Sequence, residues 1–182
     1  MYVEAKKISE YPFYLRYFFR SQEKKIGQIL LPGLLWGRVP FLQVLFLWFW
    51  GHLDRKSSSL DPALRALVQV RVAQLNWCAF CIDYNAMNLL TRTDSIDKVD
   101  VLEEWETHSL FSQLERDVLH YVGIVSGANV KVPTELMGKL KSHFSDDQVV
   151  ELTALISFQN MSAKFNAALD IPSQGMCKVP TV

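Results

Sequence analysis

The apolar residues of this chain recur at the three- and four-residue spacing of amphipathic helices, and helix start signals separate the recurring segments. Ser112 and Ser145 are each followed three residues later by a Glu or a Gln, which is the pattern of a capping box. Further start signals are Pro12, Pro40 and the pair Asp61–Pro62, because proline is favoured in the first helical turn. The pattern predicts an all-α fold, a helical bundle in one domain.

Two further helices are expected beyond the one that Asp61–Pro62 opens. One would begin near Cys78 and run to about Leu90, directly after the helix that Asp61–Pro62 opens. The other, from Val149 to Leu169, keeps its apolar positions close to helical spacing and ends before Pro172. We expect this long helix to be a central packing element.

The segment 29–53 is strongly apolar and tests whether the chain enters a membrane. A spanning helix needs about 20 consecutive apolar residues, whereas prolines, glycines and Arg38 interrupt this segment before residue 41. The uninterrupted stretch from Phe41 to Trp50 is about half the length needed to span. It is apolar nearly all round, so we expect a helix that packs against another subunit, and no membrane insertion.

Composition places the chain among ordinary globular domains. Its 182 residues are 49% hydrophobic and 21% charged, which is enough to bury one core. We expect a main helical domain over residues 40–175, a helical extension over 1–39 that packs on it, and a tail over 176–182. The 19 basic and 19 acidic side chains leave no net charge, so nucleic acid is not an expected partner, whereas self-association is unopposed.

The cysteine content and the start of the chain bear on the compartment. Residues 1–10 carry four charged side chains and lack the apolar run and cleavage site of a secretory signal, so the expected location is the cytoplasm. In a reducing compartment three cysteines do not make a disulfide scaffold. A CxxC pair in such a chain indicates a redox or a metal role.

Two of the three cysteines, Cys78 and Cys81, form such a CxxC pair at the expected start of a helix. One helical turn places their side chains on one face, so a disulfide is sterically possible. The helix N-terminus would raise the thiolate fraction at neutral pH from about 3% to about 15%. No second CxxC or histidine pair accompanies them, so we expect no metal and no cofactor. The alternative is a pair of buried, inert cysteines.

The stretch from Leu64 to Cys81, LRALVQVRVAQLNWCAFC, resembles the core motif of the alkylhydroperoxidase D and carboxymuconolactone decarboxylase superfamily. Two later stretches, 144–152 and 165–172, are similar to the closing helix of its peroxidase-related members. The resemblance covers roughly residues 40–175 and implies an all-helical fold assembled as trimers or hexamers. It also implies that the CxxC reduces peroxides, with Cys81 attacking and Cys78 resolving.

The chain departs from the family's proton relay of one glutamate and two histidines. Ala66, Phe80 and Asn85 stand at those three positions, so the base that would ionise Cys81 is absent or comes from elsewhere. Arg71 and His52 are candidates if the fold brings them near, whereas an ionised Asp83 would raise the pKa of a neighbouring thiol. All four histidines lie outside the motif, so a decarboxylase is not expected.

Two functions are compatible with the sequence. The first is a thiol-dependent peroxidase or thiol–disulfide oxidoreductase that acts on a peroxide or a disulfide and is reset by a reducing partner protein. The second is a non-enzymatic oligomeric or ligand-binding family member that has lost the relay. Trp48, Phe49 and Trp50 could line a pocket for an apolar hydroperoxide, although an interface is the preferred interpretation. Cys177, in the tail, is interpreted as a free thiol.

Overall fold

The computed structural model describes residues 1–177, which form nine α-helices and two short 3-10 helices and contain no strand. The elements are η1 (Ile8–Glu10), α1 (Phe13–Ile26), α2 (Leu31–Trp36), α3 (Pro40–Leu53), α4 (Pro62–Leu75), α5 (Ala79–Thr93), α6 (Asp97–Asp100), η2 (Leu102–Glu104), α7 (Gln113–Val125), α8 (Thr134–His143) and α9 (Asp146–Ala168). The predicted all-α fold is confirmed. Of the predicted tail over 176–182, residues 178–182 lie outside the described part.

Helices α1, α3, α4, α5, α7 and α9 begin at the predicted start signals, whereas α2 and α8 have no counterpart among them. The Asp61 carboxylate accepts a hydrogen bond from the Leu64 amide at 2.8 Å and caps α4. Ser112 and Ser145 complete capping boxes at α7 and α9. Helix α2 was not predicted, because Pro32 was interpreted as an interruption. Proline fits the first turn of a helix without losing a hydrogen bond, and Pro32 occupies that turn.

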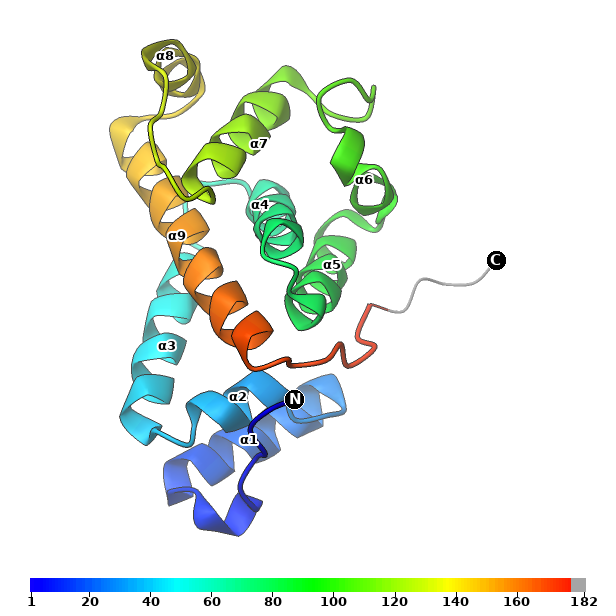
Figure 1. Cartoon of the computed structure of the whole chain (residues 1–182), viewed down its shortest axis with the longest axis vertical. Helices are drawn as coiled ribbons and strands as arrows, with labels where there is room; N and C mark the ends of the chain where they lie inside the picture. Colours follow the sequence, from blue (N-terminus) through cyan, green and yellow to red (C-terminus); the bar gives the residue numbers. More distant parts are fainter. Residues whose placement is uncertain (178–182) are drawn as a thin grey trace.

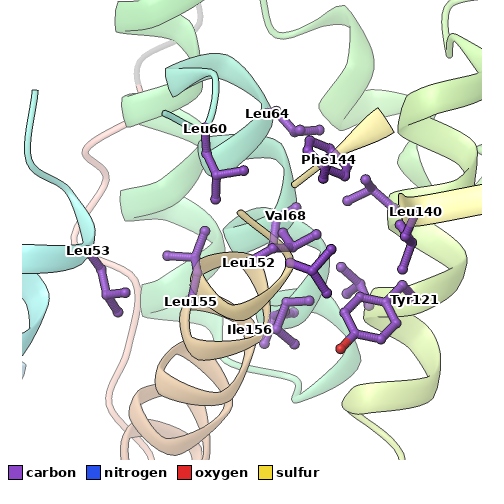
Figure 2. Close-up of a cluster of buried hydrophobic side chains, with 14 of the residues drawn as sticks. Leu53, Leu60, Leu64, Val68, Tyr121, Leu140, Phe144, Leu152, Leu155 and Ile156 are labelled. Atoms are coloured by element: carbon purple, nitrogen blue, oxygen red, sulfur yellow. The ribbon is translucent and has the colours of Figure 1, made fainter. Parts of the chain in front are cut away.

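The centre of the molecule is α4, which packs against α5, α7 and α9 (Figure 1). The main hydrophobic core lies where α4 meets α7, α8 and α9 (Figure 2). Val68 of α4, Leu140 of α8 and Leu152 of α9 are all fully buried there. Because these side chains come from helices distant in the sequence, the core ties the two halves of the chain together.

Helix α3 lies along α9 and is only partly covered within one chain (Figure 1). Gln43 and Leu53 are its buried residues. Its other large apolar side chains are partly or largely exposed, and Trp48 has 73% of its surface accessible. The burial on several sides expected from its composition is therefore not reached inside this chain.

Helices α1 and α2 lie at one end of the molecule, beneath the end of α9 (Figure 1). They have a small core of their own, in which Tyr11, Phe19 and Leu34 pack together. Gly37 follows α2 beside the Tyr11 and Phe19 rings, and a Cβ atom there would come within 2.9 Å of the Gly33 backbone oxygen and 3.1 Å of Phe19. The close approach therefore requires glycine at this position.

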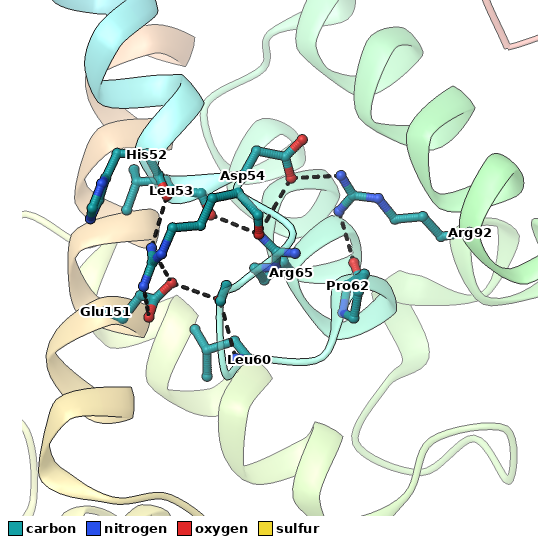
Figure 3. A network of polar contacts seen from close by, with 10 residues as sticks. His52, Leu53, Asp54, Leu60, Pro62, Arg65, Arg92 and Glu151 are labelled. Atoms are coloured by element: carbon teal, nitrogen blue, oxygen red, sulfur yellow. Dashed lines mark hydrogen bonds and ion pairs between the residues drawn. The ribbon is translucent and has the colours of Figure 1, made fainter.

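A polar network fastens the loop between α3 and α4 to α5 and α9 (Figure 3). Asp54 accepts a hydrogen bond from Arg92 of α5 at 2.6 Å and pairs with the buried Arg65 of α4 at 3.5 Å. The guanidinium of Arg55 donates two hydrogen bonds to the Glu151 carboxylate of α9, at 2.9 and 3.0 Å. Burial lowers the pKa of Arg65, and the nearby Asp54 carboxylate opposes that shift. The network fixes the start of α4 relative to α5.

In the part of the chain that the structure covers, no helix combines the length and the apolar character needed to cross a bilayer.

Candidate redox site at Cys78 and Cys81

The two cysteines of the CxxC motif lie at the corner between α4 and α5 and form a disulfide, with their Cα atoms 5.2 Å apart. Trp77 turns the chain at this corner with a left-handed φ of 54°, a conformation uncommon for a residue other than glycine. Cys78 then caps α5, because its sulfur accepts a hydrogen bond from the Cys81 amide at 3.2 Å. Both side chains are buried, with 1% and 3% of their surface exposed.

Only one of the two cysteines lines the adjacent cavity, which has a volume of about 330 Å³. Cys81 belongs to its wall and Cys78 does not. The cavity is lined by residues of α1, α2, α3, α5 and α9, and six aromatic side chains contribute to it: Phe18, Phe46, Trp50, Phe80, Tyr84 and Phe158. The two cysteines therefore differ in what can reach them, although both are nearly fully buried.

The polar groups of the cavity are almost all uncharged. The amide side chains of Gln43, Asn85, Gln159 and Asn166 line it and are each at most 5% exposed. The Asn166 Nδ2 donates a hydrogen bond to the Cys81 sulfur at 3.2 Å. Among the described residues, Lys25 is the single charged side chain of the lining, and no Asp, Glu or His contributes to it.

The residues at the three relay positions take no part in proton transfer in this geometry. Ala66 is fully buried in the core between α4 and α7. Phe80 and Asn85 do line the cavity, and the Asn85 side chain donates a long hydrogen bond, 3.4 Å, to the Gln69 carbonyl. None of the three can act as a base, because their side chains are a methyl group, a phenyl ring and a carboxamide.

The two candidate replacements for the relay, His52 and Arg71, do not line the cavity that Cys81 faces. His52 is exposed and stacks on Trp48, with ring centroids 6.4 Å apart. Arg71 donates to the Gln74 side chain at 3.2 Å, and burial lowers its pKa. Neither residue therefore replaces the relay in this arrangement.

The Asp83 carboxylate holds the C-terminal segment and does not line the cavity that Cys81 faces. It accepts hydrogen bonds from the Ser173 hydroxyl and from the amides of Gln174, Met176 and Cys177, at 2.7–3.0 Å. Burial alone would raise the pKa of Asp83, but these hydrogen bonds outweigh it and hold the pKa below its usual value. Met176 belongs to the same hydrophobic cluster as Cys78 and Cys81, so the segment closes one side of the cysteine pair.

Cys177 and the aromatic run on α3, the remaining sequence candidates, lie in different surroundings. Cys177 is a partly buried free cysteine, and burial together with Asp83 raises its pKa. Trp50 lines the cavity, Phe49 packs on Phe158 at 5.0 Å, and Trp48 points outward. The run is therefore divided between the cavity and an exposed face.

Sequence reasoning missed Gln43 and Asn166, whose buried amide oxygens in the cavity wall have no hydrogen-bond partner within residues 1–177. A signal was available for both. Gln43 interrupts an otherwise apolar stretch, and Asn166 continues a series of polar residues on the buried side of α9. Polar residues at positions whose periodicity requires burial indicate a site or a hydrogen-bond network.

A second hollow, about 580 Å³, lies between α4, α5, α7 and the loops at their ends. Several of its charged groups already have partners, since Asp61 caps α4 and Glu115 pairs with Lys98. It contains no cysteine, and we assign it no chemistry.

Comparison with known proteins places this architecture. The model of the carboxymuconolactone decarboxylase family matches residues 40–122. Protein YnjA of Escherichia coli (strain K12) is 42% identical over 173 residues, which cover 95% of each chain. At this identity and coverage the two chains share a family.

Solved structures agree in fold. The alkylhydroperoxidase AhpD core protein of Ralstonia eutropha JMP134, described as peroxidase-related, has a TM-score of 0.85 at 18% identity, covering 96% of this chain and 93% of that one. The debrominase Bmp8, in complex with 2,3,4-tribromopyrrole, has a TM-score of 0.80 at 21% identity, covering 97% and 92%. The chain thus belongs to the carboxymuconolactone decarboxylase family and has the alkylhydroperoxidase D-like fold.

Proposed function

We propose that this protein is a thiol-dependent peroxidase and thiol–disulfide oxidoreductase in which Cys81 attacks and Cys78 resolves. The observation that carries the proposal is the difference between the two sulfurs, because Cys81 faces the cavity whereas Cys78 lies behind it within disulfide reach. A substrate held in the cavity meets the attacking sulfur first. The resolving sulfur is already in place for the second step.

The proposed cycle begins with the reduced pair. The Cys81 thiolate attacks the terminal oxygen of a hydroperoxide, so that an S–O bond forms, the O–O bond breaks and the alkoxide leaves and takes up a proton. The Cys78 thiol then displaces hydroxide from the Cys81 sulfenic acid, which yields the disulfide and water. A dithiol of a reducing partner protein supplies the two electrons and two protons that restore the thiols.

The lining of the cavity favours an uncharged, largely apolar substrate. Six aromatic rings line the space, and Lys25, the one charged residue that the described part of the chain contributes to it, is itself exposed to solvent. Transfer of an ionised group into such surroundings is costly unless it is paired. We therefore favour an organic hydroperoxide over a charged one, and a disulfide substrate only if its reacting sulfur can enter the cavity.

Self-assembly is part of the proposal. The exposed apolar face of α3 comprises Phe41, Leu42, Val44, Leu45 and Trp48. An apolar patch of contiguous side chains on a monomer is typical of an interaction site. A homo-oligomer, trimeric or hexameric as in the family, would cover this face.

The competing proposal is a ligand-binding or assembly protein without turnover. The absence of Asp, Glu and His from the described cavity lining favours it, since no side chain there can accept the proton of Cys81. Turnover separates the two proposals, because a binding protein would retain ligands but would not consume peroxide.

The test is a stopped-flow measurement of cumene hydroperoxide consumption by the reduced protein and by the matched variants Cys81→Ser and Cys78→Ser. We expect the wild type to consume peroxide and form the disulfide, Cys78→Ser to react once and stop at the sulfenic acid, and Cys81→Ser to be inactive. Equal rates for the wild type and Cys81→Ser would remove the peroxidase proposal and favour the binding protein.

A further inference from the structure

The carboxamide of Asn166 donates a hydrogen bond to the Cys81 sulfur, while its oxygen has no hydrogen-bond partner within the described chain. The donor is Nδ2, 3.2 Å from the sulfur, and the oxygen, Oδ1, is buried. The residue lines the cavity and has 1% of its surface exposed. Buried acceptors are nearly always paired in native proteins, so an unpaired one in a cavity wall points to a group that pairs with it when bound.

We infer that Asn166 has two roles at this site, neither of which is the proton transfer of the missing relay. Its Nδ2 hydrogen bond stabilises the Cys81 thiolate, and its Oδ1 accepts the hydrogen bond of an O–H donor on the bound substrate. The inference rests on the proposed function, because it concerns the same sulfur. It names the substrate class more narrowly, as an uncharged molecule whose reacting oxygen carries a hydrogen.

The first task follows from the charge of the thiolate. A hydrogen bond to the charged form of a group favours that form and lowers its pKa. A donor aimed at sulfur gains strength when the sulfur becomes anionic, because hydrogen bonds to ions are stronger than those between neutral groups. A carboxamide thereby assists ionisation without itself carrying or accepting a proton.

The surroundings of Cys81 leave Asn166 as the side chain observed to donate to its sulfur in the described structure. From α5, Tyr84 faces the cavity and burial raises its pKa, while Asp83 is turned to the C-terminal segment. From α1, Lys25 stands in the lining as an exposed side chain. Helices α2, α3 and α9 contribute no titratable group to the lining.

The second task follows from the geometry of the attack. A hydroperoxide whose terminal O–H donates to Oδ1 has its terminal oxygen next to the amide that also holds the sulfur. That oxygen is the atom that the thiolate attacks in the proposed cycle, and the other oxygen leaves with the organic group. One side chain would thus position both reacting atoms.

The thiolate pKa tests the first task without any peroxide. In a Cys78→Ser, Cys177→Ser background Cys81 is the single cysteine, and its ionisation is followed by ultraviolet thiolate absorbance as the pH rises. We expect Asn166→Leu to lower the thiolate population at neutral pH by about tenfold. Asn166→Asp, which keeps the shape but adds a negative charge when ionised, should raise the pKa of the thiol further.

Asn160→Leu is the matched control, because Asn160 lies on the same helix and is buried, but bonds to Asn76 and Ser126 instead of the cysteine. We expect it to leave the thiol pKa unchanged. If Asn166→Leu does not fold, the isosteric Asn166→Asp variant decides. A thiol pKa that stays unchanged in a folded Asn166 variant would overturn the inference.

Reaction rates at a pH where every variant is fully ionised test the second task. We expect Asn166→Leu still to react several-fold more slowly with cumene hydroperoxide, but to react as fast as the parent with monobromobimane, which carries no O–H donor. Equal deficits with both reagents would contradict a role for Oδ1. Failure of the proposed function would look different, because the parent itself would then not react with the hydroperoxide.

Discussion

The two halves of α9 are buried to a similar extent but differ in what they bury. The first half contributes Val149, Leu152, Leu155 and Ile156 to the main core, where each side chain meets other apolar groups. The second half buries Gln159, Asn160, Ser162 and Asn166, and three of these line the cavity beside Cys81. The difference indicates that one helix holds the fold together at one end and forms a site at the other.

The largest expected effect concerns the first half. Leu152 is fully buried in the core between α4, α8 and α9, and Leu152→Ala would leave a cavity there. We expect the free energy of unfolding to fall by about 2–5 kcal/mol, measured by urea denaturation. A loss below about 1 kcal/mol would mean that this end of α9 does not support the fold as described.

The next effect concerns the segment that closes the cysteine pair from the other side. Asp83→Asn removes the charge that accepts the hydrogen bonds from residues 173–177, and we expect a loss of about 1–3 kcal/mol at neutral pH. The lower end is expected because the carboxylate is partly exposed to solvent. Glu104→Gln, at an exposed carboxylate, is the control and should change little.

The contribution of Asp83 to the free energy of unfolding should depend on pH and be lost in acid. The pKa of Asp83 in the folded protein lies below the unfolded value of about 3.9, so its stabilisation is complete above about pH 5 and is lost as the pH falls through the folded pKa. In Asp83→Asn this part of the acid dependence should disappear. Identical acid unfolding curves for the wild type and the variant would contradict it.

The smallest effect on stability is expected at the cavity end, where function should suffer instead. Gln43 is 1% exposed and its Oε1 has no partner within residues 1–177. Replacing such a group with an apolar one of similar size is nearly neutral or stabilising, so Gln43→Leu should change the free energy of unfolding by no more than about 1 kcal/mol. Peroxide consumption should nevertheless fall several-fold, with monobromobimane labelling of Cys81 unchanged. A large loss of stability would assign Gln43 to the fold.

The contrast within α9 also marks what the sequence could predict. Local signals were sufficient for the helix starts, because Asp61, Ser112 and Ser145 act on amides of their own first turn. The CxxC pair could also be predicted, because its two cysteines are only three residues apart in the sequence. The cavity could not be predicted from local sequence, because Gln43 and Asn166 are far apart in the chain. Only the packing of α3 and α9 brings them to one wall.

The same limitation explains the unsuccessful candidates for the relay. Arg71 and His52 were named for their chemistry, but helix direction decides where a side chain points. Arg71 donates to Gln74 on the same helix, α4, and His52 is exposed near the end of α3 beside Trp48. The group that does reach the sulfur is a neutral amide, which a search for acids and bases overlooks.

The product of a single oxidation tests most directly whether Cys81 attacks the peroxide and Cys78 closes the disulfide. The reduced protein is treated with one equivalent of cumene hydroperoxide, and the intact mass and the cysteine linkage are determined by mass spectrometry. The proposed cycle predicts that the protein loses two hydrogens and gains a Cys78–Cys81 disulfide, and that Cys81→Ser forms no such link. An unchanged mass, or a sulfenic acid that forms equally well in Cys81→Ser, would contradict it.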